Sequence, residues 1–238
     1  MLTWAPSYDD ITFAASDAYA GDLSGHFGMA SATAGGGAEI DNIICFTPGT
    51  RLLTQFGDRP IETLAVGDMV VTRDHGLRPI RWIGRRDLPG TGRFAPVRIA
   101  PDMAGGDTCG GLLISPQHRI LFTGYTAELL FGESEVLVAA KHLVNDNDVR
   151  IVPRATVTYV HIMFDRHEII YADGIAAESF HAGDAAITAI DAAAREELFA
   201  VFPELRIAAG RHLETARTCL KKREAALLAR ESARSLTV

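Results

Sequence analysis

The sequence has few cysteines, and no pattern joins them. Cys45, Cys109 and Cys219 are the three cysteines among 238 residues, and they form no C-x-x-C pair. An odd number of distant cysteines argues against a disulfide framework and against a structural zinc site. At least one of them is therefore a candidate for chemical reactivity.

Long apolar runs and an early positive charge are also missing. No run approaches the roughly 18 apolar residues of a membrane-spanning helix, and the first 50 residues contain neither Lys nor Arg. The basic start of a secretory signal peptide and the Arg-rich face of a mitochondrial one are therefore absent. We expect a soluble chain that is cytoplasmic, or exported without such a signal.

The chain also lacks an excess of basic residues. It has 30 Asp and Glu against 23 Lys and Arg, which gives a formal charge of -7. Binding to phosphate backbones needs a basic surface, so we expect no nucleic-acid partner. Its length and 47% hydrophobic content fit one medium domain with small appendages, or two small domains.

Charge and periodicity divide the chain into three predicted regions. Residues 1–44 carry six acids, no base and many Ala and Gly, which predicts an acidic leader or linker. Residues 45–184 contain short β-type runs broken by Gly, Pro and Asp, which predicts an all-β domain. Its expected strands are residues 52–55, 69–72, 79–83, 112–115, 119–123, 136–138, 149–152 and 156–164.

The third region, residues 185–238, has a helical period and predicts a two-helix extension. Thr188 and Asp191 have capping-box spacing before an Ala-rich segment that ends near Pro203. We interpret the charged residues of this region as solvated helix faces and assign them no chemistry. Helical spacing over a second segment is shown by Leu213, Ala216, Leu220 and Leu227.

Cys45 is the first residue of the predicted β domain, in the stretch Cys-Phe-Thr-Pro-Gly-Thr at 45–50. A nucleophilic thiol at the start of a domain faces the peptide bond before it, here the bond to Ile44. A buried structural cysteine is the alternative, because a free Cys packs well as a small hydrophobe. Position alone leaves both interpretations open.

Ser115 and His118 follow the apolar residues 112–114 at a strand end or tight turn. A hydroxyl and an imidazole three residues apart can hydrogen-bond one amide from two sides. An ordinary surface turn is the alternative, because turns favour Ser and Pro.

Two more histidines, His161 and His167, lie on and just after the last expected strand, and Asp173-Gly174 nearby predicts a turn. A metal site is not indicated, since the H-E-x-x-H pattern and a third ligand at suitable spacing are both missing. We therefore expect no metal and no cofactor. The G-x-S-x-G elbow of α/β-hydrolases is also missing.

Taken together, these segments resemble the Hint (Hedgehog/intein) family, most closely its bacterial subgroup whose domains open with Cys-Phe-Thr-Pro-Gly-Thr. The resemblance covers roughly residues 45–184. It implies a compact, horseshoe-like all-β fold in which the first cysteine attacks the preceding carbonyl, here that of Ile44. Besides the opening, it is carried by Ser115 with His118 and by the residues 59–62, 66–70, 78–84, 166–168 and 174–180.

The resemblance also implies roles for the remaining candidates. In the family a Thr-x-x-His motif, matched by Ser115 and His118, holds the scissile amide and helps to protonate its nitrogen. A later strand brings a further polar group to the cysteine, and His161 aligns with that position, with His167 as its rival. Either imidazole could deprotonate Cys45, because imidazole titrates near neutrality and a thiol only about two units higher.

Two departures from the family pattern bear on the steps after thioester formation. An intein ends with Asn, but no Asn follows Asn147 and no Gln follows Gln117, so we expect no complete splicing. The charged helices after Thr188 are unlike the sterol-recognition segment of Hedgehog proteins. The leader is thus the expected substrate, cleaved between Ile44 and Cys45, with water, a small thiol or a protein amine as acceptor.

Two other functions stay open. In one, the Hint body is a structural or presentation module of a larger or exported bacterial protein and performs no chemistry. In the other, which fits least, the protein is a cysteine hydrolase that acts on other molecules. The compartment stays open between the cytoplasm and a non-classical bacterial export route.

Overall fold

The structure is a computed structural model, and it describes residues 44–100, 111–181, 190, 192–202, 205 and 214–234. Residues 1–43 of the acidic leader, Cys109, the capping pair Thr188 and Asp191, and Leu213 of the second predicted helix lie outside the described residues. Within these ranges, no helix is long and apolar enough to cross a bilayer.

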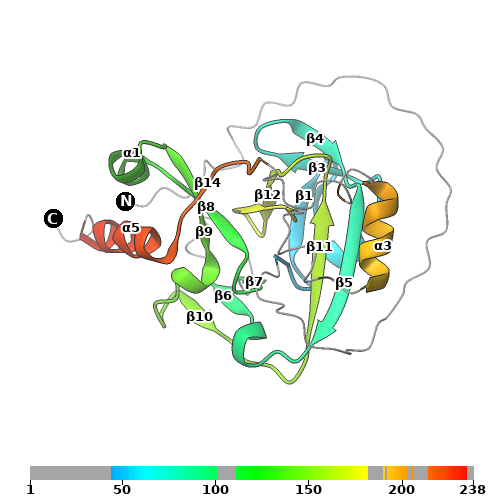
Figure 1. The fold of residues 1–238 in the computed structure, drawn as a ribbon, viewed down its shortest axis with the longest axis horizontal. Coiled ribbons are helices and arrows are strands. Elements are labelled where there is room, and N and C mark those ends of the chain that lie inside the picture. The colour runs from blue at the N-terminus through cyan, green and yellow to red at the C-terminus, as the bar shows by residue number, and fades with distance from the viewer. Residues whose placement is uncertain are drawn as a thin grey trace.

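Short β-strands make up most of the described chain (Figure 1). They are β1 (Arg51–Thr54), β2 (Gly57–Pro60), β3 (Met69–Thr72), β4 (Gly76–Pro79), β5 (Trp82–Leu88), β6 (Val97–Ile99), β7 (Leu112–Ile114), β8 (Arg119–Thr123), β9 (Glu135–Ala139), β10 (Val149–Ile151), β11 (Val157–Met163), β12 (Ile169–Ala172), β13 (Ile175–Glu178) and β14 (Thr218–Cys219). The α-helices are α1 (Tyr125–Phe131), α3 (Ala192–Val201) and α5 (Lys222–Arg234), and the short 3₁₀ helices are Ile61–Thr63, Gly92–Phe94 and Ala140–His142.

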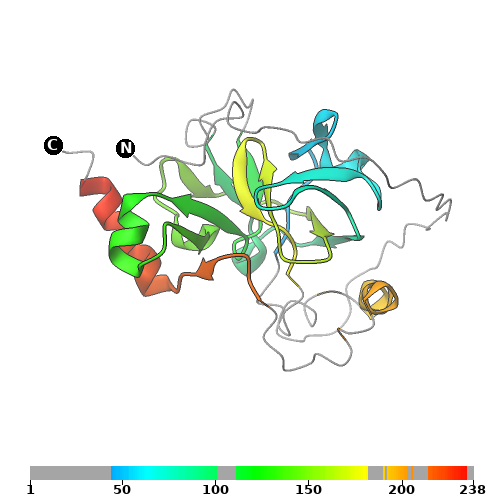
Figure 2. The ribbon, with the colours of Figure 1, turned by 90° about the horizontal axis from the view of Figure 1, so that it is seen from above.

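The strands form one large sheet and two small ones among the described residues. The large sheet has nine strands in the order β14-β9-β8-β13-β12-β1-β3-β4, with β2 paired to β1. The small sheets are β10-β6-β7 and the pair β11-β5. In both views α5 lies beside α1, and α3 lies at the other end of the molecule (Figures 1 and 2). There α3 contacts β5.

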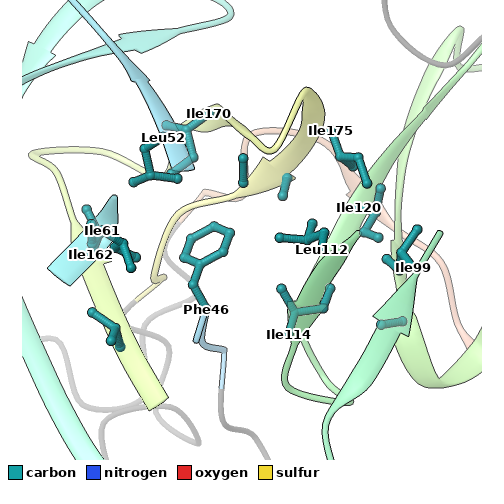
Figure 3. Packing of buried hydrophobic residues seen from close by; sticks show 14 of the residues in the cluster. Phe46, Leu52, Ile61, Ile99, Leu112, Ile114, Ile120, Ile162, Ile170 and Ile175 are labelled. Atoms are coloured by element: carbon teal, nitrogen blue, oxygen red, sulfur yellow. The ribbon is translucent and has the colours of Figure 1, made fainter. Parts of the chain in front are cut away.

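Phe46 joins the two small sheets. It forms antiparallel bridges to Ile114 in β7 and to Val160 in β11. Its ring is 1% exposed and lies in the middle of the largest apolar cluster, among Leu52, Ile61, Ile114 and Ile162 (Figure 3). Burying a Phe side chain stabilises the fold by about 1.5–3 kcal/mol. This anchor fixes the position of the residue before it, Cys45.

The predicted all-β body with a small helical tail is confirmed. The strands expected at 69–72 and 119–123 have the observed bounds, and the turn at Asp173-Gly174 joins β12 to β13 with positive φ angles of 48° and 77°. Such a two-residue turn with both φ positive matches the twist of an antiparallel hairpin.

The strand expected at 79–83 is wrong, because these residues span the end of β4 and the start of β5. The backbone turns between them, where the Ile80 N–H donates to Asp68 and the Arg81 N–H donates to Met163. Ile80 is fully buried, so its apolar side chain fills the core from a connection rather than from a strand. A short strand-like pattern alone does not distinguish a strand from a buried connection.

The second predicted helix is also partly wrong, and it begins later than its apolar spacing suggested. Thr218 and Cys219 form β14, which pairs in parallel with Val136 and Leu137 of β9. The helix α5 starts at Lys222, after the Glu224 side chain accepts the Lys221 N–H at 2.6 Å. The edge of β9 therefore pairs with a segment whose local sequence pattern is helical. The first helix, α3, ends at Val201, close to the predicted end.

Residues of the third predicted region pack against the β body. Leu198 of α3 is fully buried in one apolar cluster with Ile44 and Trp82. Ile190, Phe202 and Leu205 belong to the same cluster. The division of the chain at residues 44 and 184 stays a prediction.

Candidate active site

The peptide bond between Ile44 and Cys45 lies inside the protein, at the junction of the two small sheets. Ile44 is 2% exposed and Cys45 is fully buried. Two backbone hydrogen bonds of 3.0 and 2.9 Å tie Phe46 to Val160, and the Ser115 N–H donates to the Cys45 carbonyl at 3.0 Å. The bond is thus clamped between the end of β7 and the middle of β11.

Ser115 contacts the nitrogen of this peptide bond. The Cys45 N–H donates to the Ser115 hydroxyl oxygen at 3.0 Å, and Ser115 is fully buried. Because Ser115 follows β7 directly, the strand end places its hydroxyl on the amide. The group that would leave in an attack on the Ile44 carbonyl is therefore held by a hydrogen bond.

His161 contacts the carbonyl oxygen of Ile44 and the sulfur atom of Cys45. Its Nδ1 lies 2.8 Å from the Ile44 carbonyl oxygen, and both of its ring nitrogens lie 3.4 Å from Cys45 Sγ. A carbonyl oxygen only accepts, so Nδ1 carries the hydrogen in this arrangement. With Nε2 unprotonated, this one ring can both polarise the carbonyl and receive the thiol proton.

The Cys45 thiol is not ionised by its surroundings. Burial raises its pKa well above the ordinary value, and the charge of Arg86 opposes this only in part. The thiolate is the nucleophile in thiol chemistry. A reaction through this thiol would therefore need a base near Sγ, and His161 is a side chain in contact with Sγ.

His118 packs against Phe46 and is fully buried. Its ring meets the Phe46 ring edge-on at 4.3 Å between centroids. Burial lowers the pKa of His118 to about 4, although the Glu178 charge and the Cys45 backbone oppose the shift. In this state the imidazole is neutral near pH 7.

His167 lies away from this group, in a second buried cluster. Its Nε2 is 3.2 Å from Glu178 Oε2, and its Nδ1 accepts the Ala216 N–H at 3.0 Å. Arg119 donates to the same carboxylate at 2.9 Å. Burial raises the pKa of Glu178, but His167 and Arg119 outweigh it and hold that pKa below its usual value. We call these three residues the Glu178 cluster.

Of the five predicted site residues, the structure brings Cys45, Ser115 and His161 to one peptide bond, with His118 beside Phe46. It does not bring His167 to Cys45. Their catalytic roles stay predictions.

Two aromatic neighbours of the site had no predicted role. Trp82 stacks on His161, and Phe180 meets it edge-on. A usable signal was present for Trp82, since Trp82 and Gly84 alternate with Ile83 and therefore share one face of a strand. Phe180 lies in the segment 174–180 that carries the family resemblance, but nothing in that segment indicates a contact with His161.

Comparison with known proteins identifies the family. A sequence profile of the Hint domain matches residues 44–184. No curated protein is significantly similar to the chain.

Similar solved structures include a bacterial intein-like domain from Clostridium thermocellum, with 14% identity over 58% of this chain and 100% of that one, and a TM-score of 0.38. A variant of the MchDnaB-1 intein has 15% identity over 57% and 99% of the two chains and a TM-score of 0.37. A splice-inactive AceL NrdHF split intein has 14% identity over 56% and 95%, also with a TM-score of 0.37. Because the profile spans more than half of the sequence, the chain belongs to the Hint domain family.

Proposed function

We propose that this Hint domain processes itself through Cys45, which attacks the Ile44 carbonyl and forms a thioester. Three contacts around one peptide bond carry the proposal. The thiol lies against His161, the carbonyl oxygen accepts from the same ring, and the amide nitrogen donates to Ser115. A thiol, an electrophile and a held leaving group are the parts that an N–S acyl shift requires.

The first step exchanges one bond for another. Cys45 Sγ forms a bond to the Ile44 carbonyl carbon, and the bond from that carbon to the Cys45 nitrogen breaks. The thiol loses its proton to Nε2 of His161, while Nδ1–H stabilises the negative charge that develops on the carbonyl oxygen. The nitrogen gains one proton and becomes the free amine of Cys45, so charge and atoms balance.

His118 is the proposed donor of that proton. Its pKa of about 4 means that a protonated His118 is a far stronger acid than an ordinary imidazolium. Because His118 is neutral near pH 7, it must first receive a proton, and the one available is the thiol proton that His161 has taken. Its transfer through His118 to the nitrogen returns both histidines to the neutral state.

The second step releases or transfers the leader. Water, a small thiol or an amine attacks the thioester carbonyl, the carbon–sulfur bond breaks, and Sγ regains its proton. The chain up to Ile44 leaves as an acid or joined to the acceptor, and the remaining fragment begins with Cys45.

One observation favours the alternative, a Hint-derived module without chemistry. Ile44 and Cys45 are buried, and the crevice that reaches His161, lined by Trp82, Ile190 and Ala194, has no room for a water molecule. An acceptor therefore does not reach the carbonyl through this crevice. The module hypothesis predicts that the chain stays intact under all conditions.

The intact mass of freshly purified protein distinguishes the two functions. Wild type is incubated at neutral pH with and without dithiothreitol, beside Cys45→Ala. Self-processing predicts one fragment ending at Ile44 and one beginning at Cys45, only in wild type and faster with the thiol. A single uncut mass in every sample, or cleavage that survives in Cys45→Ala, contradicts the proposal.

A further inference from the structure

The two strands that carry His161 and Trp82 place these residues on one face. In the β5–β11 pair, His161 lies opposite Gly84, and Met163 lies opposite Trp82. Trp82 and His161 are therefore diagonal neighbours, a separation that a large aromatic side chain can bridge. His161 has no side chain directly across from it.

The space above Gly84 is filled by the indole of Trp82. A Cβ atom at Gly84 would lie 2.2 Å from Cη2 and 2.6 Å from Cζ2 of that ring. Any residue other than glycine would push the indole away. With glycine there, the indole reaches across and stacks on the His161 ring, at 6.0 Å between centroids and 29° between planes.

Phe180 bounds the His161 ring on another side. Their centroids are 4.9 Å apart at 74°, and Phe180 also contacts Trp82 at 5.7 Å. The Phe180 N–H donates to Ile162 at 2.8 Å, which ties this wall to β11 itself. Trp82 is 3% exposed, and its Nε1–H has no hydrogen-bond partner within the described residues. Its contribution to the site is thus the ring and not the N–H.

A histidine ring needs such walls, because rotation about its outer torsion is soft. Here one ring makes both the contact to Cys45 Sγ and the contact to the Ile44 carbonyl. A rotated ring would lose the two together, and a flipped ring would place the basic nitrogen on the carbonyl.

We infer that Trp82 is a positioning residue, which fixes the plane of the His161 ring through the gap left by Gly84. This inference rests on the proposed self-processing reaction for its kinetic meaning. The geometry that it describes can also be tested without that reaction.

The kinetic test replaces the ring and keeps a matched control. Trp82→Leu should slow cleavage on the order of a hundredfold, as a small misplacement of a reacting group does. Trp82→Phe, which retains an aromatic face, should recover most of the rate. The control Ile162→Ala removes a side chain that is also buried but lies on the opposite face of β11. Ile162→Ala should slow cleavage by no more than a few-fold, even where its Tm falls as far as that of Trp82→Leu. An equal loss of rate in the control overturns the inference.

Gly84→Ala adds a second, independent arm. It should slow cleavage in the presence of Trp82, because the new methyl group displaces the indole. In the double variant with Trp82→Leu, Gly84→Ala should not slow cleavage any further, since no indole ring is left to displace. Effects that add in the double variant would contradict the inference.

A spectroscopic measurement separates this inference from the proposed function. The ring ¹⁵N signals of His161 are followed by NMR against pH in Cys45→Ala, which cannot form the thioester, with and without Trp82→Leu. We expect a single tautomer protonated at Nδ1 with Trp82 present, and a mixture with a shifted titration midpoint without it. Unchanged ring signals overturn the positioning role. If wild type proves inert to cleavage, this measurement still decides it.

Discussion

His161 and His167 are neighbours in the sequence, but the structure gives them opposite surroundings. His161 contacts two uncharged groups of the reacting centre, the thiol of Cys45 and the carbonyl of Ile44. His167 faces the carboxylate of Glu178, which is also paired with Arg119. An imidazole between a thiol and a carbonyl can take the thiol proton and donate a hydrogen bond to the carbonyl oxygen. Both ring nitrogens of His167 are engaged, by the Glu178 carboxylate and the Ala216 N–H, so we predict a structural role for it.

The largest expected effect sharpens this contrast directly. His161→Ala should slow cleavage about a thousandfold, because it removes both the base and the donor to the carbonyl. His167→Gln, a substitution in the Glu178 cluster, should change the cleavage rate by no more than a few-fold. Band intensities of the two fragments over time give both rates. Equal losses in the two variants would mean that the clusters are not functionally distinct.

A second prediction concerns stability against pH at His118. Its pKa is 6.5 in the unfolded chain and about 4 in the folded one, so between these values the unfolded state binds the extra proton. Stability should fall by about 3 kcal/mol as the pH drops from 6.5 to 4, with no further loss from this group below 4. Urea unfolding across this range measures it, and His118→Phe should flatten the curve. An equally steep curve in the variant would show that other groups are responsible.

The Glu178 cluster should matter for stability and less for chemistry. His167→Ala leaves the buried Glu178 with Arg119 alone and removes the acceptor of the Ala216 N–H, which should lower the free energy of unfolding by about 1–3 kcal/mol. Because the folded pKa of Glu178 lies below 4.5, the stability that this carboxylate contributes is present above pH 4.5 and is lost below it. Urea unfolding of the variant at pH 7 and pH 3 checks both statements. A variant as stable as wild type at pH 7 contradicts the first.

The smallest expected effect is at the leaving nitrogen. Ser115→Ala removes one neutral hydrogen bond to the Cys45 N–H, worth about 0.5–1.5 kcal/mol, so cleavage should slow by roughly 2- to 12-fold. Ser115→Thr should retain the rate. A loss as large as that of His161→Ala would place Ser115 among the proton-transfer groups instead.

The sequence was informative about residues whose role depends on chain order. Cys45 opens the β body, and Ser115 and His118 follow an apolar strand, but these positions left alternatives open until the resemblance to the Hint family singled them out. The choice between His161 and His167 depended on register, since a shift of one residue moves a side chain to the other face of a strand. The structure places His161 against Cys45, on the face of β11 that also carries Tyr159 and Met163.

The features that the sequence did not predict depend on partners distant in the chain. The segment of Thr218 and Cys219 has helical spacing, yet it pairs with β9. Residues 79–83 have the pattern of one short strand, but the chain turns at Ile80 and Arg81, whose N–H groups donate to Asp68 and Met163. In both cases long-range hydrogen bonds override the local pattern. The contact of Trp82 with His161 is hidden for the same reason, because it requires the pairing of β5 with β11.

The central claim, that Cys45 forms a thioester with Ile44, is tested most directly by trapping that bond. Wild type and Cys45→Ala are incubated with hydroxylamine at neutral pH, and the released leader is analysed by mass spectrometry. The account predicts a leader ending in the hydroxamate of Ile44, formed from wild type only, together with a fragment that begins at Cys45. A wild-type chain that stays intact in hydroxylamine, or the same hydroxamate from Cys45→Ala, would contradict it.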